Sequence, residues 1–407
     1  MESAFFDVAI VGGGPAGSAT ALSLQTHAPS LSIVLIEASD YDACRIGETL
    51  PPPTRTILEH LQVWEDFCAL ESREVFGTTA VWGHAIPIDN DFIFMPANTG
   101  WHVDRARFDH MLAIAAQKRG AKLFRQTSVH VVDWTDGHWR LKLSTGNAVS
   151  ARFIVDASGG RAAIARRLGA RFETLDQLVG IARFFENHSN DARLLVEAFE
   201  HGWWYTAGLP GGKRIVSCIT DSDLARRIEL NKTEEWQRSL AAAPVVASVL
   251  RECKPCGGLV ARSAASRRLE PVATETWLAV GDAASRFDPL SSQGIFKALR
   301  SGVFASYAIG DWLTRSDDSG LQRYRRYVAK EFESYCKQRA KYYGEEQRWP
   351  TSQFWLRRKV AQPLWATKGH KKRPKAFCQP GCAFVFVPLC LFVLLCFFVI
   401  PSRPPGR

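Results

Sequence analysis

The chain lacks any acidic residue after Glu346, although 11 lysines and arginines follow that position. These basic residues outweigh the net charge of +10 that the 407 residues carry together, so residues 1–346 are close to neutral. A protein that binds nucleic acid usually has a basic body or a basic face. We therefore expect no nucleic acid among the partners of this protein.

A secretory signal and a disulfide framework are also absent. Few residues precede the apolar run at 5–11, which leads straight into glycines and leaves no room for a charged region and a cleavage site. The ten cysteines are scattered, and Cys253 and Cys256 form a single CxxC without the second pair that a zinc site normally needs. These absences predict a cytoplasmic protein with reduced thiols and no bound metal.

The C-terminal tail contains a long apolar run. Residues 383–400 are 18 residues without a charge, and the basic stretch 368–375 precedes them. This length is about the minimum for a helix to span a bilayer, and the positive charges stand on the side that is expected to stay cytoplasmic. Pro388 interrupts the run. Two interpretations stay open: a tail anchor that contacts a membrane through 383–400, and a tail without such a role.

The first positive signal is an opening β–α–β unit. A strand-like run up to Val11 leads into a glycine turn, a helix to about residue 25 and a second strand at 32–38. The turn carries GxGxxG at Gly12, Gly14 and Gly17, with Pro15 and Ala16 at the helix start. These glycines allow a tight turn, the approach of a pyrophosphate and close packing of helix on strand, while the helix N-terminus attracts the anion. Glu37, which ends the second strand, is placed to accept hydrogen bonds from a ribose, so we expect a dinucleotide site.

Two later segments bear on which dinucleotide is bound. Residues 153–159 form a strand that runs into Asp156, and residues 277–282 form a strand that ends in Gly281 and Asp282. With the GxGxxG motif they resemble the recurring signature of FAD-dependent enzymes of the p-hydroxybenzoate hydroxylase-like, glutathione reductase-type class. The resemblance implies that these residues bind FAD. It also implies that a long helix, expected at about 291–313, directs N–H groups at its start toward the flavin ring, Gln293 and Gly294 among them.

Several polar residues are candidates for contacts with the cofactor. Arg105 matches the arginine with which that class begins the helix that passes near the cofactor. Arg107 is the alternative, and a solvated arginine at a helix start is the third interpretation. Arg45, Glu48 and His102 are further candidates near the front of the flavin, and a role in stabilising turns stays open for each of them.

Two motifs narrow the resemblance to one branch. The loop at 47–51 (GETLP) and the segment at 202–210 (GWWYTAGLP) resemble tryptophan halogenases, geranylgeranyl reductase-like proteins and the flavoproteins that modify tryptophan in precursors of quinone-cofactor enzymes. This resemblance covers about residues 4–340. The halogenases carry a lysine shortly after the Gly-Glu loop, whereas this chain has no lysine before Lys118. The resemblance therefore favours insertion of oxygen over halogenation.

Three adjacent aromatic residues are candidates for a substrate pocket. Trp203, Trp204 and Tyr205, together with His102, would wall an apolar site for an aromatic ring. The alternative is that neighbouring residues of a strand face opposite sides, so that some of them belong to the core. No residue is nominated as a catalytic acid or base, because in such enzymes the cofactor carries the difficult step.

We expect an α/β protein with a Rossmann-like FAD-binding domain, an inserted β-sheet substrate domain and a helical C-terminal segment. The expected division is 1–75, 103–177 and 271–320 for FAD binding, 76–102 and 178–270 for the substrate domain, 321–366 for the helical segment, and 367–407 for the basic and apolar tail.

The expected function is that of an FAD-dependent monooxygenase. NAD(P)H would be the electron donor, and no second GxGxxG is present to hold it permanently. The substrate implied by the resemblance is an aromatic small molecule or a peptide or protein that contains tryptophan. The alternatives are a prenyl-chain (geranylgeranyl) reductase, a tryptophan halogenase and a flavin-binding assembly factor without turnover.

Overall fold

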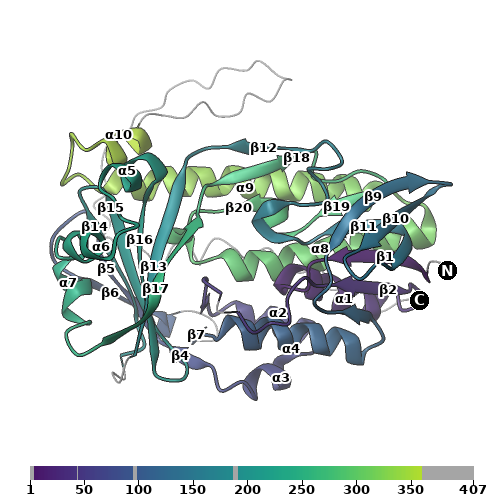
Figure 1. Cartoon of the computed structure of the whole chain (residues 1–407), viewed down its shortest axis with the longest axis horizontal. Helices are drawn as coiled ribbons and strands as arrows, with labels where there is room; N and C mark the ends of the chain where they lie inside the picture. The colour runs from purple at the N-terminus through teal and green to yellow at the C-terminus, as the bar shows by residue number, and fades with distance from the viewer. Residues whose placement is uncertain (1–3, 44, 95–98, 187–190, 360–407) are drawn as a thin grey trace.

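The computed structural model describes residues 4–359 except 44, 95–98 and 187–190. A mainly parallel sheet and a mainly antiparallel sheet lie toward opposite ends of the molecule, and the long helix α9 (Ser319–Glu345) runs between them (Figure 1). The predicted anchor at 383–400 falls outside the described residues. Among those that are described, no helix combines the length and the apolar character that a membrane crossing requires.

The first sheet is built on the β–α–β unit. Its strands in spatial order are β8 (Lys122–Phe124), β2 (Ile33–Ile36), β1 (Ala4–Val11), β11 (Ala148–Asp156), β10 (His138–Leu143) and β9 (Val129–Thr135), and β19 (Trp277–Ala279) also pairs with β11. The strands β8, β2, β1, β11 and β19 are parallel, and their carboxyl ends meet at one edge. The central strands are apolar and buried, as expected for parallel strands covered on both faces.

Three helices pack around this sheet: α1 (Pro15–His27), α4 (Arg105–Lys118) and α8 (Gly294–Arg315). α1 and α8 approach closely because both carry small residues at the contact. A Cβ at Gly302 would lie 2.5 Å from the carbonyl oxygen of Ala16 and 3.0 Å from the Cβ of Ala19. This close packing connects the GxGxxG turn, at the start of α1, to the segment that carries Gly281 and Asp282, which α8 follows.

The second sheet collects two separate stretches of the chain. Its strands in order are β17 (Lys254–Ser263), β13 (Leu178–Glu186), β16 (Lys213–Asp221), β15 (Gly202–Leu209), β14 (Leu194–Phe199), β5 (Gly77–Val81) and β6 (Ile88–Asp91). One of its two hydrophobic clusters contains residues of the C-terminal helices, and the other contains residues of the short helices α5 (Ser222–Arg227), α6 (Thr233–Leu240) and α7 (Pro244–Ser248). The expected fold class, a Rossmann-like domain with an inserted β-sheet domain and C-terminal helices, is therefore confirmed.

Short elements join the two sheets. They are α2 (Thr54–His60), α3 (Trp64–Cys68), the small sheet of β3 (Thr49–Leu50), β7 (Gly100–His102) and β4 (Arg73–Val75), and the small sheet of β12 (Arg171–Thr174), β18 (Arg267–Glu270) and β20 (Ser285–Arg286). α9 also bridges the sheets: the Tyr324 hydroxyl donates to the carbonyl of Ala279 in β19, and the carbonyl of Tyr342 accepts from the Trp82 indole.

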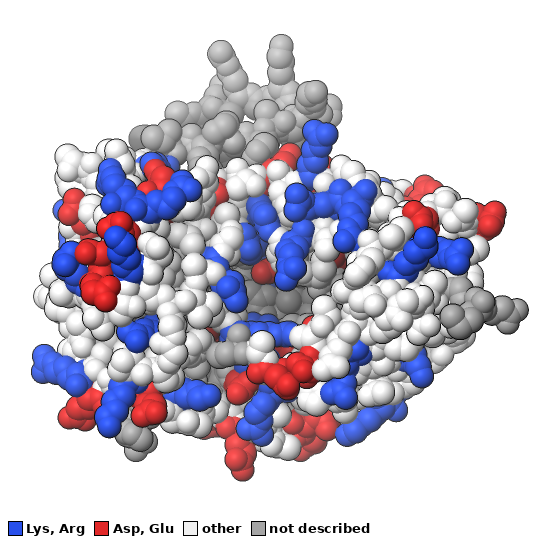
Figure 2. Space-filling model, in the orientation of Figure 1, with Lys and Arg blue, Asp and Glu red and all other residues white. Residues whose placement is uncertain are grey.

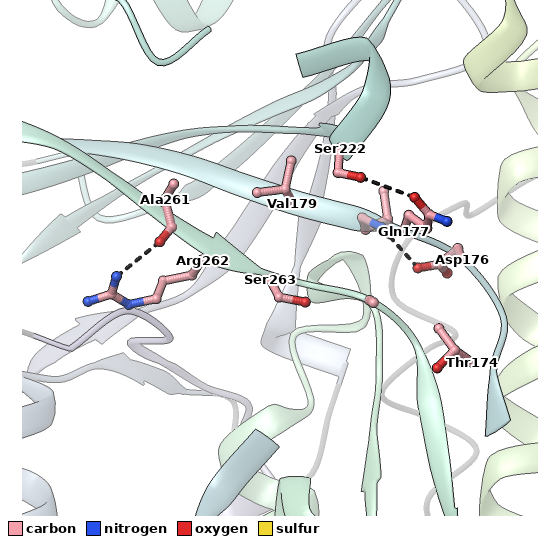
Figure 3. Close-up of a pocket in the computed structure, with 10 residues that line it drawn as sticks. Thr174, Asp176, Gln177, Val179, Ser222, Ala261, Arg262 and Ser263 are labelled. Carbon is pink, nitrogen blue, oxygen red and sulfur yellow. Dashed lines mark hydrogen bonds between the residues drawn. The ribbon is translucent and has the colours of Figure 1, made fainter. Parts of the chain in front are cut away.

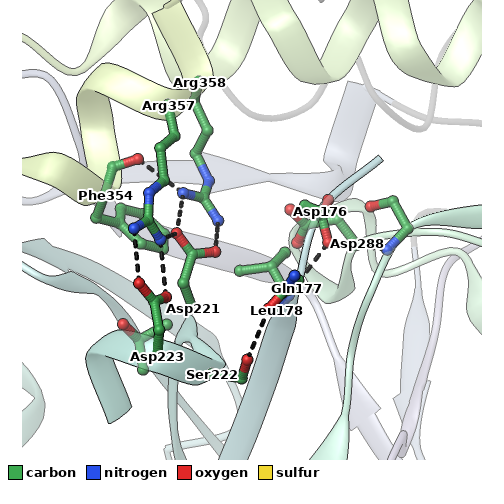
Figure 4. A network of polar contacts seen from close by, with 12 residues as sticks. Asp176, Gln177, Leu178, Asp221, Ser222, Asp223, Asp288, Phe354, Arg357 and Arg358 are labelled. Carbon is green, nitrogen blue, oxygen red and sulfur yellow. Dashed lines mark hydrogen bonds and ion pairs between the residues drawn. The ribbon is translucent and has the colours of Figure 1, made fainter. Parts of the chain in front are cut away.

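The last described helix, α10 (Gln353–Lys359), fastens onto the second sheet, and we call it the C-terminal clasp. Phe354 and Trp355 are fully buried, and the Trp355 indole donates to the carbonyl of Phe199 at 3.0 Å. Arg358 makes a buried ion pair with Asp221 at 2.7 Å, beside the exposed pair of Arg357 and Asp223 (Figure 4). The clasp thus completes the core of the sheet with residues far away in the sequence.

Candidate functional site

The glycine turn has the geometry that its spacing predicts. Gly12 has a φ of +115°, and a Cβ there would lie 2.2 Å from the carbonyl oxygen of Ala157. A Cβ at Gly17 would lie 2.0 Å from the carbonyl oxygen of Gly12, so helix and strand touch as backbones. A Cβ at Gly14, in contrast, would meet nothing within 4 Å. Gly12 and Gly17 thus serve the fold, and Gly14 faces open space.

The start of α1, at Pro15 and Ala16, suits an anion. No side chain caps this N-terminus, and the first turn holds no acidic residue. A helix end of this kind presents uncapped N–H groups and a partial positive charge. Open space at Gly14 and uncapped N–H groups beside it are together what a pyrophosphate requires.

Glu37 lies next to this turn at the end of β2. Its carboxylate accepts from the N–H of Gly13 at 2.7 Å, from the hydroxyl of Ser39 at 2.5 Å and from Arg45 at 3.3 Å. Arg45 also pairs with the buried Asp109 at 2.6 Å. The structure therefore brings Glu37 and Arg45 together, as parts of one polar network beside the turn.

Arg105 opens α4 and holds the loop that carries the Gly-Glu motif. Its guanidinium donates to the carbonyls of Ile46 and Gly47 at 3.2 and 2.7 Å and pairs with Asp109 at 3.1 Å. Arg107 lines a separate cavity of about 390 Å³ with Tyr41 and other polar residues. A direct contact of Arg105 with the cofactor stays a prediction, and its contacts with the chain position the loop.

Asp156 ends β11 and is fully buried. One of its carboxylate oxygens accepts from the N–H and the hydroxyl of Ser158, and the other accepts from the N–H groups of Ile164 and Ala165. All of these donors belong to the turn at 157–165. In the structure Asp156 therefore shapes this turn, and a contact of its carboxylate with FAD stays a prediction.

Gly281 and Asp282 follow β19 at the same sheet edge. A Cβ at Gly281, whose φ is +59°, would lie 2.8 Å from the Cβ of Ala16, so the two predicted FAD segments are in contact. Asp282 pairs with Lys297 of α8 at 3.2 Å. The Lys297 ammonium is buried and also donates to the carbonyl of Ser285. Lys297 is not among the residues predicted from the sequence, although a lysine inside the mainly apolar stretch 294–302 is a signal that points to it.

Side chains of α9 and β15 hold the segment between Asp282 and α8 in place. Asp288 is fully buried and accepts from the Tyr343 hydroxyl at 2.6 Å, and that hydroxyl in turn accepts from the Trp203 indole at 2.9 Å. Burial raises the pKa of Asp288. Gln293 stands at the N-cap position of α8 without a side-chain capping hydrogen bond, and Gly294 begins the helix, with open space where its Cβ would stand. Asp288 is likewise not among the residues predicted from the sequence.

Two buried titratable residues, Glu48 and His102, lie where β3 pairs with β7. Glu48 and His102 are linked through the pairing of β3 with β7, and the N–H of Val103 donates to the carbonyl of Glu48. Burial raises the pKa of Glu48 and lowers the pKa of His102 to about 4. His102 shares a hydrogen bond between Nδ1 and the carbonyl of Gly208 at 2.9 Å. Because a carbonyl only accepts, Nδ1 carries the proton and Nε2 is a buried acceptor without a partner among the described residues.

The three adjacent aromatic residues do not form one wall. Trp203 and Tyr205 belong to the hydrophobic cluster that also contains α9 and α10 residues, whereas Trp204 packs on Trp236 in the cluster on the opposite face. The prediction that Trp204 shares a pocket with its neighbours is therefore wrong, because successive residues of β15 point to opposite faces of the sheet. A pocket role for Trp203 and Tyr205 stays a prediction.

A cavity of about 350 Å³ opens at the end of the second sheet (Figure 3). Its walls come from β12, the start of β13, the start of α5 and the end of β17. The lining residues include Thr174, Asp176, Gln177, Val179 and Ser263. Asp176 is tied to the buried Arg339 of α9 at 2.9 Å, so one wall of the cavity is anchored to the helix that bridges the two sheets.

Comparison with known proteins identifies the class. The profile of the FAD binding domain family matches residues 6–334, so the chain belongs to that family. It is 32% identical over 372 residues to the protein named "Putative FAD-dependent oxidoreductase LodB" of Marinomonas mediterranea, with 89% of this chain and 99% of the relative covered.

Two solved structures extend the comparison. CmlS, a flavin-dependent halogenase, matches with a TM-score of 0.79 and 26% identity over 89% of this chain and 68% of that chain. The peptidyl tryptophan dihydroxylase QhpG matches with a TM-score of 0.72 and 22% identity, covering 89% of this chain and 80% of that chain. The protein is thus an FAD-dependent enzyme of the superfamily that holds flavin halogenases and hydroxylases, and the expected class is confirmed.

The residues present fit FAD. The open space at Gly14 and the uncapped start of α1 would receive the pyrophosphate, and Glu37, beside this turn, would accept from the adenosine ribose. Asp282 and the open start of α8 at Gly294 lie farther along the same sheet edge. The predicted cofactor, FAD, is therefore confirmed, while the role of each single residue stays a prediction.

Proposed function

We propose that the protein is an FAD-dependent monooxygenase that hydroxylates an electron-rich aromatic ring, with tryptophan in a peptide or protein as the substrate. In the balanced reaction a ring C–H becomes C–OH, NAD(P)H is oxidised to NAD(P)+, and O₂ with one proton supplies the inserted oxygen atom and one water. FAD, when bound, supplies the transfer of electrons from the donor to O₂. The likeness to QhpG supports a peptide as the substrate.

The observation that carries this proposal concerns lysine. The chain has no lysine before Lys118. The halogenases of the branch carry their lysine in that earlier part of the chain, shortly after the Gly-Glu loop. Within the described residues the fully buried lysine is Lys297, and its ammonium is engaged by Asp282 and the carbonyl of Ser285. The buried lysine of the described residues therefore offers no free ammonium to hypohalous acid, which supports oxygen insertion.

The chain's own residues bind, orient and exclude water in this proposal. Tyr205 and Glu48 are buried at the front of the site, and Trp203 fixes Tyr343 and through it Asp288. Apolar aromatic walls of this kind hold an aromatic ring and keep water away. The buried Nε2 of His102 is able to accept a hydrogen bond and unable to donate one while Nδ1 holds the proton.

Halogenation is the second candidate, because the fold of CmlS matches most of this chain. One experiment separates the candidates. The purified FAD-loaded protein is reduced by NADH or NADPH without oxygen, then exposed to air with a tryptophan-containing peptide, with and without chloride or bromide. A peptide that gains the mass of one oxygen atom, independent of halide, supports the monooxygenase.

The other outcomes identify the alternatives. A peptide that gains a halogen only when halide is present identifies a halogenase and refutes the proposal. When a prenyl alkene replaces the peptide, a reduced flavin that reduces the alkene while no oxygen enters the product identifies a prenyl-chain reductase. A flavin whose reoxidation no substrate changes identifies an assembly factor without turnover.

A further inference from the structure

Two arginines stand directly opposite each other in the small sheet that joins the domains. In the register of β18 and β20, Arg267 is paired with Arg286. Like charges in such a cross-strand pair destabilise a sheet. The arrangement therefore costs stability in the protein alone, and a compensating group is expected elsewhere.

No acidic side chain makes an ion pair with either arginine within the described residues, although the Asp282 carboxylate is near enough to act on both through its charge. Arg267 makes no hydrogen bond or ion pair there: its Nε is buried without a partner, and its guanidinium stacks on the Phe172 ring at 3.8 Å. Arg286 donates only to neutral oxygens, the carbonyl of Ala265 at 3.0 Å and the hydroxyl of Ser263 at 2.8 Å. Burial, together with the charge of Arg286, lowers the pKa of Arg267 to about 10.

The next residue along β18 shows the contrast. Arg268 makes an ion pair with Glu173 of β12 at 2.7 Å. The same short strand thus provides one arginine with its acidic partner and leaves the other without one. The lack of a partner at Arg267 is specific to the face on which Arg286 also lies.

Both guanidinium groups converge on the carboxyl end of the first sheet. The position that a Cβ of Gly160 would take lies 2.7 Å from Nη1 of Arg286 and 3.3 Å from Nη2 of Arg267. Gly160 follows β11, and the carboxyl ends of parallel strands are where α/β proteins bind ligands. Figure 2 shows lysines and arginines gathered around a hollow near the middle of one face of the molecule.

The pair also adjoins the cavity at the end of the second sheet. Ser263 and Ala265, which accept the hydrogen bonds of Arg286, both line that cavity. The arginines therefore lie between the cavity formed largely by the substrate sheet and the edge at which FAD binds. A ligand that extends from one to the other passes them.

We propose that Arg267 and Arg286 form a subsite for a carboxylate carried by the aromatic substrate. This inference rests on the proposed function and deepens it by naming an acidic substrate. The planar guanidinium matches a carboxylate with two parallel hydrogen bonds, and the anion removes the repulsion between the two arginines. The carboxylate comes either from an acidic side chain beside the aromatic residue or from the α-carboxylate of a free amino acid.

The test measures binding to the FAD-loaded full chain by calorimetry. The probes are acetyl-Asp-Trp-amide and N-acetyltryptophan, each matched with a probe whose carboxylate is replaced by an amide. The variants are Arg267→Met and Arg286→Met, and Arg140→Met is the matched control because Arg140 is an exposed arginine of β10 that lines neither cavity.

The wild type is expected to bind one acidic probe about tenfold or more tightly than its amide, as for a charge-assisted hydrogen bond. Arg267→Met and Arg286→Met are expected to lose that preference and leave binding of the amide unchanged, and Arg140→Met is expected to keep it. A preference for acetyl-Asp-Trp-amide over its amide identifies an acidic side chain as the source of the carboxylate. A preference for N-acetyltryptophan over its amide identifies the α-carboxylate. Arg267→Met is expected to leave the melting temperature unchanged or raised, because it removes a like charge and no hydrogen bond.

Three results would overturn the inference. They are equal binding of acidic and amide probes by the wild type, variants that weaken NADPH or FAD binding instead of probe binding, and a large loss of melting temperature in Arg267→Met. Failure of the proposed function looks different, because the acidic probe then binds with the expected preference but gains no oxygen. An amide probe that is hydroxylated without any acidic preference leaves the function standing and refutes the subsite.

Discussion

A substitution at Gly14 distinguishes an effect on FAD binding from an effect on folding. Its φ of −75° and ψ of −173° are allowed for any residue, and a Cβ there meets no atom within 4 Å. Gly14→Ala should therefore fold normally. The apoprotein should be as stable as the wild type or gain about 0.4–1 kcal/mol, because alanine has fewer unfolded conformations than glycine.

Binding of FAD should suffer in the same variant. The added methyl group occupies the open space by which a pyrophosphate reaches the N–H groups at the start of α1. Loss of one charge-assisted hydrogen bond costs about 1.5–3 kcal/mol, so the Kd for FAD should rise about 10- to 100-fold. The assay pairs thermal unfolding of the apoprotein with a titration of FAD followed by flavin fluorescence.

Gly17→Ala is the contrasting variant. Its Cβ would lie 2.0 Å from the carbonyl oxygen of Gly12, so helix and strand must separate and the apoprotein itself should lose stability. A Gly14→Ala protein that binds FAD as tightly as the wild type would refute the assignment of this space to the pyrophosphate. So would a Gly14→Ala apoprotein as unstable as Gly17→Ala.

Three further predictions concern charged groups. Lys297→Met should weaken FAD binding and cost about 1–3 kcal/mol of stability, because the carbonyl of Ser285 loses its buried donor and Asp282 loses its partner; urea unfolding and an FAD titration check both. The hydrogen bond from Arg357 lowers the pKa of Asp223 to about 2, so this pair stabilises the fold above about pH 4 and the effect is lost as the pH falls toward 2. Asp223→Asn should flatten that part of the acid unfolding curve, by no more than about 1 kcal/mol because the pair is exposed. Burial lowers the pKa of His102 to about 4, so the stability that neutral His102 contributes is complete above about pH 6.5 and is lost as the pH falls toward 4. His102→Gln should therefore lose less stability between those two pH values than the wild type does. An unchanged dependence of the unfolding free energy on pH would contradict the burial argument.

The parts of the fold that sequence predicts well are those whose constraints are local. The helix that Arg105 is expected to begin is α4, and the GxGxxG turn lies between β1 and α1 as its glycines require. The helix expected at about 291–313 begins at Gly294, because Ser292 takes a φ of +49° and interrupts the backbone before it. Signals of this kind depend on a few neighbouring residues, so they can be recognised without the tertiary structure.

The parts that sequence did not predict depend on register and on distant contacts. Arg267 and Arg286 face each other only because β18 and β20 pair, and no local pattern announces that pairing. The ion pair of Lys297 with Asp282 depends on how α8 packs against the segment that carries Asp282, and the residues around Lys297 do not predict it. The separation of Trp203 from Trp204 is predictable from the sequence, because successive residues of a strand point to opposite faces of the sheet. A strand with both faces covered places Trp204 in the second core.

The C-terminal clasp means that the substrate sheet is finished by residues synthesised long after its strands. Until Phe354 and Trp355 arrive, the face of the sheet that carries Trp203 and Tyr205 exposes aromatic surface that the finished protein buries. A nascent chain that has completed α9 without α10 is therefore in an aggregation-prone interval. For protein production this sets a boundary inside the described chain: a truncation before Lys359 removes part of the core, so shortened versions should retain α10 entire.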